Sequence, residues 1–256
     1  MSHPPVDRAG VLAARLAAAQ QACTLIDAPT AEESPVDAQE AYDIQHRALS
    51  LRGETAVGWK VGAKSPSGPI QGAPLPSIGV RMSPASMNLS HFATCGLELE
   101  IAFRFGRSFK PRAQAYDDEE VFEGIASMMA AIEIVSTRYV GWPGVDKLAQ
   151  LADLQNHGAL IVGEPIPYQS DFPFMAPRLS FHLDRVDVLR GAPANPAGDP
   201  RRLLPWLVNH ASSRGLTISS DIVVTTGSYA GMHFAKNPGT ANGDIEGLPS
   251  VQVDLI

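Results

Sequence analysis

Several features that mark particular classes of protein are scarce in this sequence. Cys23 and Cys95 are its only cysteines and do not form a CxxC pair, so we expect reduced thiols rather than a disulfide framework. No Lys/Arg cluster stands against the net charge of −7, which disfavours a nucleic-acid binder. No apolar run approaches the roughly 20 residues of a membrane span, and no apolar signal segment follows the N-terminus. We therefore expect a cytoplasmic protein that binds neither nucleic acid nor membrane.

What remains is the composition of an ordinary globular protein. Hydrophobic residues make up 45% and charged residues 18% of the 256 residues, enough for a sizeable core. Helical patterns gather early in the chain and strand patterns late, which favours an α+β fold over a regular βαβ alternation. The predicted helices cover 9–22, 34–53, 145–153 and 200–215. The predicted strands cover 55–61, 96–105, 132–135, 157–163, 221–228 and 250–256, with a β-ribbon at 174–191.

Two further segments carry specific expectations. Residues 64–79 are rich in Pro, Gly and Ser and are predicted to form a long loop. Residues 116–131 begin with an acidic turn and continue with near-helical apolar spacing, so a helix is predicted there, passing into a strand near residue 132. In the second helix, Asp37 is the expected N-cap and Glu40 completes an approximate capping box.

The clearest chemical signal lies in residues 96–105, GLELEIAFRF, which alternate strictly. In a strand, Glu98 and Glu100 share one face with their Cα atoms roughly 6.5 to 7 Å apart. The pair alone is also typical of a solvated sheet face. Glu133 lies in AAIEIV, closely flanked by apolar residues, where an unpaired buried carboxylate would be costly. Three carboxylates from two strands would suit a hard divalent cation such as Mg²⁺.

Five segments then match one known family in order and spacing. They are GWKVGAKS (58–65), LELEIAF (97–103), AAIEIVSTR (130–138), LADLQNHGALIVG (151–163) and DIVVTTGSYAGM (221–232). From about residue 35 onward the chain resembles the 2-keto-4-pentenoate hydratase family of the fumarylacetoacetate hydrolase superfamily, a family that also contains the 4-oxalocrotonate decarboxylases.

The resemblance implies a fold and an organisation. The expected fold is α+β, with a mixed β-sheet roll of the fumarylacetoacetate hydrolase C-terminal type preceded by a small helical part. A mainly helical N-terminal subdomain would cover residues 1–75, and a β-rich catalytic domain carrying the metal site would cover 76–256. The resemblance also implies a closed homo-oligomer and a role in aromatic catabolism.

The resemblance assigns roles to individual residues as well. It implies that Mg²⁺ or Mn²⁺ binds to Glu98, Glu100 and Glu133. It implies that Lys60, from the family's G-[YW]-K-[IV]-G motif, orients or protonates an enolate. The other expected roles are catalysis by Asp153 and His157 and substrate binding by Ser65, Asn156, Thr226 and Ser228. Simpler interpretations stay open: Asp153 as a helix cap, His157 as a half-buried polar residue, and the TTGS segment as a plain turn.

The chain also departs from the family pattern. Ser77 and Ser136 stand where many members carry acidic residues, and Leu154, Gln155 and Asn156 replace the family's Asn-Ala-Ser. These changes remove proton carriers and spare the metal ligands. We therefore expect His157 to act as a replacement acid or base, because a histidine titrates near neutral pH.

The sequence thus predicts an Mg²⁺-dependent lyase acting on a small 2-oxo or 2-hydroxydienoic acid, and favours a hydratase of the 2-keto-4-pentenoate type. Three alternatives remain: a 4-oxalocrotonate-type decarboxylase, a C–C bond hydrolase of the same superfamily, and a non-catalytic homologue that binds metal and ligand. Hydration and decarboxylation share an enolate, so the sequence barely separates them.

Overall fold

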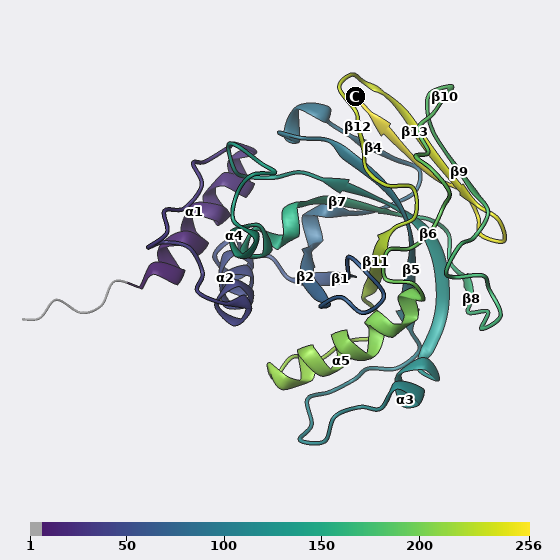
Figure 1. The fold of residues 1–256 in the computed structure, drawn as a ribbon, viewed down its shortest axis with the longest axis horizontal. Helices are drawn as coiled ribbons and strands as arrows, with labels where there is room; N and C mark the ends of the chain where they lie inside the picture. The colour runs from purple at the N-terminus through teal and green to yellow at the C-terminus, as the bar shows by residue number, and fades with distance from the viewer. Residues whose placement is uncertain (1–6) are drawn as a thin grey trace, which may run out of the picture.

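A curved nine-stranded sheet forms the centre of the computed structural model, which describes residues 7–256 (Figure 1). Its strands are β1 (Ala56–Gly62), β2 (Gln71–Pro76), β3 (Val80–Met82), β5 (Gly96–Phe105), β6 (Ile125–Val135), β7 (His157–Val162), β8 (Ile166–Pro167), β11 (Val223–Ser228) and β12 (His233–Phe234). The main path runs β2-β1-β11-β5-β6-β7-β3, while β12 pairs with β5 and β8 pairs with β6. Parallel and antiparallel pairs both occur, so the sheet is mixed.

A smaller sheet packs against one face of the large one (Figure 1). Its strands are β4 (Ala85–Met87), β9 (Leu179–Leu183), β10 (Val186–Asp187), β13 (Gly239–Ile245) and β14 (Val251–Leu255). They are arranged in the order β10-β9-β13-β14-β4. The two sheets approach closely at Gly243, where any side chain would collide with Leu99 of β5. The main hydrophobic core therefore lies between the sheets.

The helices cover other parts of the large sheet. They are α1 (Arg8–Ala22), α2 (Ala38–Leu51), α3 (Asp118–Phe122), α4 (Lys147–Ala152) and α5 (Leu203–Ser213). Helices α1, α2 and α4 form a second core around Leu16, Ile44 and Ala149 at one end of the sheet (Figure 1). No helix among the described residues is long and apolar enough to cross a membrane.

The alternation within β5 decides which face carries the chemistry. Leu97, Leu99 and Ile101 point into the main core, so the glutamates between them point to the opposite face. On that face Glu98 pairs in register with Glu133 of β6, because β5 and β6 are antiparallel neighbours. The sheet thus brings together carboxylates that lie 35 residues apart in sequence.

Most predicted elements are present, with two corrections. The helix predicted from residue 116 onward ends at Phe122, and the strand begins at Ile125 rather than near residue 132. Pairing of β6 along nearly the whole length of β5 outweighs the near-helical spacing of the apolar residues. The predicted loop 64–79 contains the strand β2, whose prolines are tolerated because β2 lies at the edge of the sheet.

The predicted division after residue 75 stays a prediction. Helices α1 and α2 lie beside the large sheet, whereas β1, from the same part of the chain, pairs with β11 and β2 inside it. The expected N-cap of α2 is present, since the Asp37 side chain accepts a hydrogen bond from the Glu40 backbone N–H at 2.8 Å.

Two histidines meet between α2, α5 and β1. His46 and His210 both lie near the ring of Trp59, and His210 stacks on Trp206 with ring centroids 4.7 Å apart. Burial, and then the nearby charge of Arg214, lower the pKa of each histidine from 6.5 to about 4. Both rings are therefore neutral in the folded protein near pH 7.

These histidines predict a loss of stability in acid. Their pKa is lower in the folded state, so between pH 6.5 and 4 the unfolded chain binds more protons at these sites. Above pH 6.5 both histidines are neutral in the folded and unfolded states, and the free energy of unfolding is not reduced by them. It decreases as the pH drops from 6.5 to 4. Each histidine should lower the free energy of unfolding by about 1 to 2 kcal/mol over this pH range, a value reduced for solvent screening because both rings are partly exposed. Thermal unfolding from pH 7.5 to 4.5 should show a flatter profile for a His46→Gln/His210→Gln variant than for the parent; parallel profiles would contradict the assignment.

Candidate metal centre and active site

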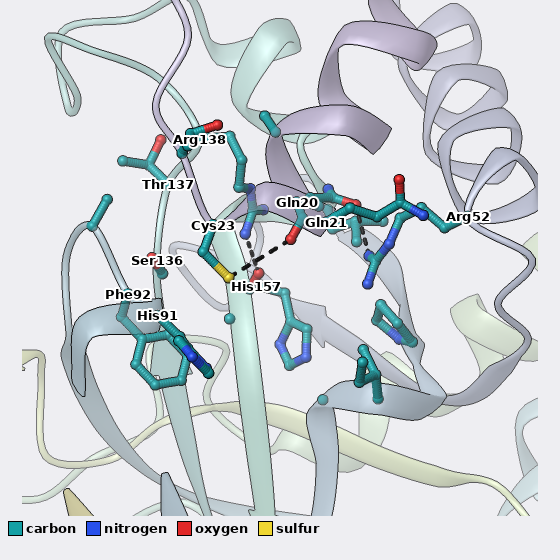
Figure 2. A pocket seen from close by; sticks show the side chains of 18 of the residues that line it. Gln20, Gln21, Cys23, Arg52, His91, Phe92, Ser136, Thr137, Arg138 and His157 are labelled. Atoms are coloured by element: carbon teal, nitrogen blue, oxygen red, sulfur yellow. Dashed lines mark hydrogen bonds between the residues drawn. The ribbon is translucent and has the colours of Figure 1, made fainter. Parts of the chain in front are cut away.

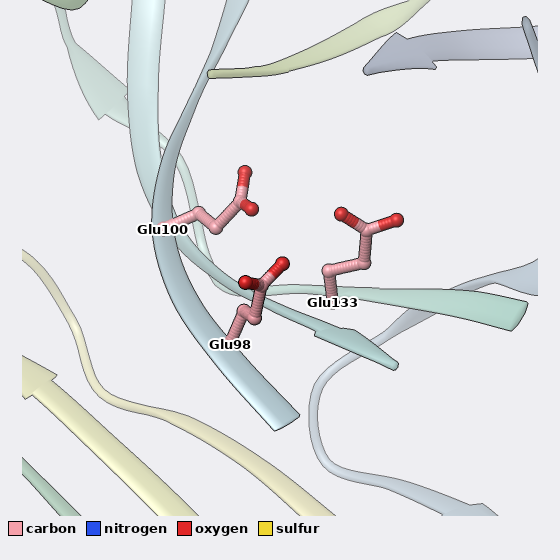
Figure 3. Close-up of side chains that lie close together, drawn as sticks. All are labelled: Glu98, Glu100 and Glu133. Atoms are coloured by element: carbon pink, nitrogen blue, oxygen red, sulfur yellow. The ribbon is translucent and has the colours of Figure 1, made fainter. Parts of the chain in front are cut away.

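Three glutamate side chains converge on the face of the sheet away from the main core (Figure 3). Glu98 and Glu100 come from β5 and Glu133 from β6, and one carboxylate oxygen from each lies within 4.8 Å of the others. Glu100 and Glu133 are each only 1% exposed to solvent. Among residues 7–256, this is the one group of three or more Asp, Glu, His or Cys side chains that lie close enough together to hold a metal ion.

The three carboxylates carry more negative charge than the neighbouring Lys60 balances. Burial, together with repulsion from neighbouring carboxylates, raises the pKa of Glu98 to about 8 and that of Glu100 to about 7. Burial alone would also raise the pKa of Glu133, but Lys60 and His157 reverse the direction and lower it. A divalent cation would replace protons in this oxygen-only donor set, so the three residues fit a hard cation.

Strand β11 orients the carboxylate of Glu100. The Thr225 hydroxyl and the Gly227 backbone N–H (2.8 Å) both donate to its Oε2 atom. Thr226 is one of the four expected substrate contacts, but its hydroxyl donates to the Ile101 carbonyl at 2.8 Å and faces the main core. The correction follows from strand alternation, because Thr225 stands in register with Lys60 and shares its face.

Lys60 and His157 both bind the same oxygen of Glu133. The Nζ atom of Lys60 lies 2.6 Å from Glu133 Oε1, and His157 Nδ1 lies 2.9 Å from it. Burial by itself lowers the pKa of Lys60, but the three carboxylates outweigh it and the net direction is upward. Lys60 is therefore an ammonium at neutral pH. The structure brings this predicted residue into the cluster.

Asp153 does not reach the cluster, contrary to its expected catalytic role. Its carboxylate is fully buried, accepts from Arg138 Nε at 2.5 Å, and accepts from the Arg138 backbone N–H at 2.9 Å. The alternative of a structural residue at the end of α4 fits this placement. Arg138 was not singled out from the sequence, although the presence of a charged residue in a buried segment was a signal for it.

Arg138 also brackets an unusual turn that leads to His157. Leu154, Gln155 and Asn156 all have left-handed φ angles of 50 to 59°. The Arg138 guanidinium donates to the carbonyl before this turn, at Asp153 (2.6 Å), and to the one after it, at His157 (2.5 Å). Within the turn, the Gln155 carbonyl accepts from Lys60 Nζ at 3.4 Å. The turn thus delivers two groups to the glutamate cluster.

Two adjoining cavities open onto the cluster. One, of about 380 Å³, is lined by the three glutamates, Ser228 and Arg190; the other, of about 500 Å³, is lined by Glu98, Asn156, Lys64 and Lys147. Lys60 and Gln155 line both. Asn156 and Ser228 thus lie in the cavity walls, and their contact with substrate stays a prediction. Ser65 is not among the lining residues, and its carbonyl instead accepts from the Arg202 guanidinium at 3.0 Å.

The serines that replace family acids lie elsewhere. Ser136 lines a third cavity of about 450 Å³ on the other side of His157, with Cys23, Arg52 and Phe92 (Figure 2). The Ser77 hydroxyl donates to the Glu54 carboxylate, which also accepts from the Ile78 backbone N–H at 3.3 Å. A carboxylate is thus present in this loop region, but it comes from Glu54.

No family model matches the sequence, and no curated protein matches it. Solved structures do match. The chain is similar to 4-oxalocrotonate decarboxylase from Pseudomonas putida G7 complexed with magnesium and adipate, with a TM-score of 0.85 and 19% identity over 100% of both chains. The chain has the fold of that enzyme.

Further structures agree with this fold. The same enzyme complexed with calcium and acetate gives a TM-score of 0.84 at 18% identity, again over 100% of both chains. A 5-carboxymethyl-2-hydroxymuconate delta-isomerase from Mycobacterium smegmatis gives 0.57 at 15% identity, over 78% of this chain and 80% of that chain. The predicted α+β fold of the fumarylacetoacetate hydrolase type is confirmed.

The glutamate cluster predicts a specific effect of Glu100→Gln on metal binding. The substitution removes one negative charge at little change in shape, and the amide oxygen can still accept from Thr225 and Gly227. We expect Mg²⁺ affinity measured by calorimetry to fall by about tenfold or more, because ligand charge sets the affinity of such sites. Glu123→Gln, at an exposed carboxylate outside the cluster, is the matched control. Equal affinities in parent and Glu100→Gln would exclude Glu100 as a ligand.

Proposed function

We propose that this chain is a divalent-metal-dependent lyase that acts on a small 2-oxo dicarboxylic acid, as a decarboxylase of the 4-oxalocrotonate type. One observation carries the proposal: a buried cluster of three glutamates and a lysine lies at the junction of two cavities whose outer walls carry cationic side chains. The cluster would bind the 2-oxo acid end of the substrate, and the cationic side chains would bind the carboxylate at its other end.

The inner end of the site would hold the cation. Glu98, Glu100 and Glu133 supply oxygen ligands of the kind that Mg²⁺ or Mn²⁺ prefers, and their mutual repulsion is relieved by a positive charge. When bound, the cation would stabilise negative charge that develops on the 2-oxo oxygen of the substrate. The magnesium-bound decarboxylase with the same fold supports this assignment.

Lys60 is the residue placed to handle protons. Its Nζ is hydrogen-bonded to Glu133 and to the Gln155 carbonyl, faces both cavities, and carries a proton at neutral pH. A fixed ammonium beside the cluster can orient the carboxylate and 2-oxo oxygens of a substrate. It can also donate a proton from Nζ to the conjugated carbon chain.

The outer walls favour a substrate with a second carboxylate. Lys64 and Lys147 line the larger cavity and Arg190 the smaller one, and within residues 7–256 none of the three forms an ion pair with a carboxylate. The usual hydratase substrate has a single carboxylate, which the inner cluster would already engage. Cations left free at the outer end suit the distal carboxylate of a dicarboxylic acid. The full-length likeness to 4-oxalocrotonate decarboxylase supports the same choice.

The proposed reaction balances without another reactant. The bond between the carbon chain and the distal carboxyl group breaks, and carbon dioxide leaves. The electron pair moves through the conjugated chain to the 2-oxo group and forms a dienolate. A proton then returns to carbon or oxygen, and Lys60 Nζ is positioned to supply it.

The function is tested by turnover with two substrates. We expect Mg²⁺-dependent release of carbon dioxide from 4-oxalocrotonate, monitored by the loss of the ultraviolet absorbance of this substrate. We expect no turnover after chelation of the metal. Hydration of 2-hydroxypenta-2,4-dienoate with no release of carbon dioxide from 4-oxalocrotonate would favour the hydratase. Metal binding without turnover of either acid would indicate a non-catalytic binding protein.

Lys64 and Lys147 are predicted to bind the distal carboxylate of the substrate. Lys64→Met and Lys147→Met should each raise KM for 4-oxalocrotonate, by about three- to tenfold for the loss of an exposed charge contact of roughly 0.6 to 1.4 kcal/mol. The kcat values should change less, because neither lysine lies at the cluster. Lys236→Met, at an exposed lysine that lines neither cavity, is the control. Unchanged KM values in both variants would show that the distal carboxylate binds elsewhere.

A further inference from the structure

We propose that His157 is a positioning residue: its Nδ1 atom holds one oxygen of Glu133 so that the other oxygen faces Glu98 and Glu100. This assignment replaces the acid–base role expected from the sequence. It rests on the proposed function, because the orientation of Glu133 matters only if the cluster holds a cation.

The hydrogen bonds on Glu133 determine which of its oxygens is available. Oε1 accepts from Lys60 Nζ at 2.6 Å and lies 2.9 Å from His157 Nδ1. A carboxylate oxygen has about two lone-pair sites, so these contacts fill Oε1. Oε2 makes no hydrogen bond within residues 7–256 and is left to bind a cation.

The location of His157 separates it from the reaction. Its side chain is 1% exposed and does not line either cavity next to the glutamate cluster. It lines the third cavity (Figure 2), which shares no lining residue with the two beside the cluster. Its Nε2 atom is buried, with no hydrogen-bond partner among the described residues. A group in this position cannot exchange a proton directly with a substrate beside Lys60.

The surroundings hold the ring in one place. A Cβ atom at Gly79 would lie 3.4 Å from His157 Nε2, so the loop packs closely against the ring. Arg138 Nη1 donates to the His157 carbonyl at 2.5 Å and fixes the backbone. The ring nitrogen that faces Glu133 must donate, because an ionised carboxylate oxygen can only accept. The contact with Glu133 makes Nδ1 that donor.

The two donors to Glu133 therefore have different roles. Lys60 lines both cavities, so its ammonium can contact a bound substrate as well as Glu133. His157 lines neither of these cavities, and the protein encloses its side chain. Groups that hold a metal-binding carboxylate in this way typically alter metal affinity or activity by 10- to 100-fold when they are removed.

A matched pair of variants tests the assignment. In His157→Asn the side-chain amide N–H lies near the position of Nδ1 and can still donate to Glu133. In His157→Gln the amide reaches toward the position of Nε2 and cannot. We expect the Kd for Mg²⁺, measured by calorimetry, to stay within about threefold of the parent for Asn and to rise about 10- to 100-fold for Gln.

Activity gives a second readout of the same pair. The kcat of His157→Gln should recover toward that of the parent as the Mg²⁺ concentration is raised, because the defect lies in metal binding. A loss of kcat in both variants at saturating Mg²⁺ would restore the acid–base role and overturn the proposal. Equal Mg²⁺ affinities in both variants would also overturn it, because a merely structural role does not distinguish Asn from Gln.

A third variant covers the case in which His157→Gln does not fold. In His157→Ala, imidazole added to the solution can enter the cavity of about 450 Å³ beside position 157 and replace the missing donor. Imidazole should tighten Mg²⁺ binding in His157→Ala and leave the parent unchanged. No effect of imidazole in a folded His157→Ala protein would overturn the proposal.

These outcomes are distinct from a failure of the proposed function. If the parent binds Mg²⁺ but turns over neither substrate, the lyase assignment fails while the affinity ratio of the two variants still tests His157. If the parent binds neither Mg²⁺ nor Mn²⁺, the metal centre itself is wrong, and the role of His157 falls with it.

Discussion

Repulsion between three carboxylates in a largely dry place is the constraint around which this structure is organised. Two unit charges 5 Å apart repel by about 3 kcal/mol at an effective dielectric of 20, and the ligand oxygens of the three glutamates lie within 4.8 Å of one another. Glu98 and Glu133 are even direct cross-strand partners, an arrangement that usually destabilises a sheet. The cluster therefore requires compensation from donors on the strands around it.

That compensation comes from several separate segments. Lys60 of β1 and His157 of β7 bind Glu133, while Thr225 and Gly227 of β11 bind Glu100. The sheet order places β11 beside β5 and β7 beside β6, so Thr225, Gly227 and His157 reach carboxylates on neighbouring strands. The long side chain of Lys60 reaches Glu133 from β1, past β11 and β5. Even so, the pKa values of Glu98 and Glu100 stay raised, and this remaining imbalance is what a divalent cation would correct.

The left-handed turn at residues 154–156 is a second cost of building the site. Such φ angles cost about 1 to 2 kcal/mol for each residue that is not glycine. The buried Arg138–Asp153 pair and the Arg138 bonds to the flanking carbonyls hold the turn in place. Removing one partner of a buried pair costs about 3 to 5 kcal/mol, so this support is strong. The strained segment is the one that brings the Gln155 carbonyl and His157 to the cluster.

The sequence by itself determined the elements with strong local patterns and singled out the three glutamates as candidate metal ligands. Alternation in residues 96–105 placed Glu98 and Glu100 on one face, and the capping residue Asp37 marked the start of α2. Tertiary structure alone decided the rest, because pairing between distant strands is not encoded locally. It extended β6 back to Ile125, turned Thr225 rather than Thr226 toward Glu100, and joined Asp153 to Arg138. It also set His157 against Glu133, since only the folded sheet brings β6 and β7 into contact.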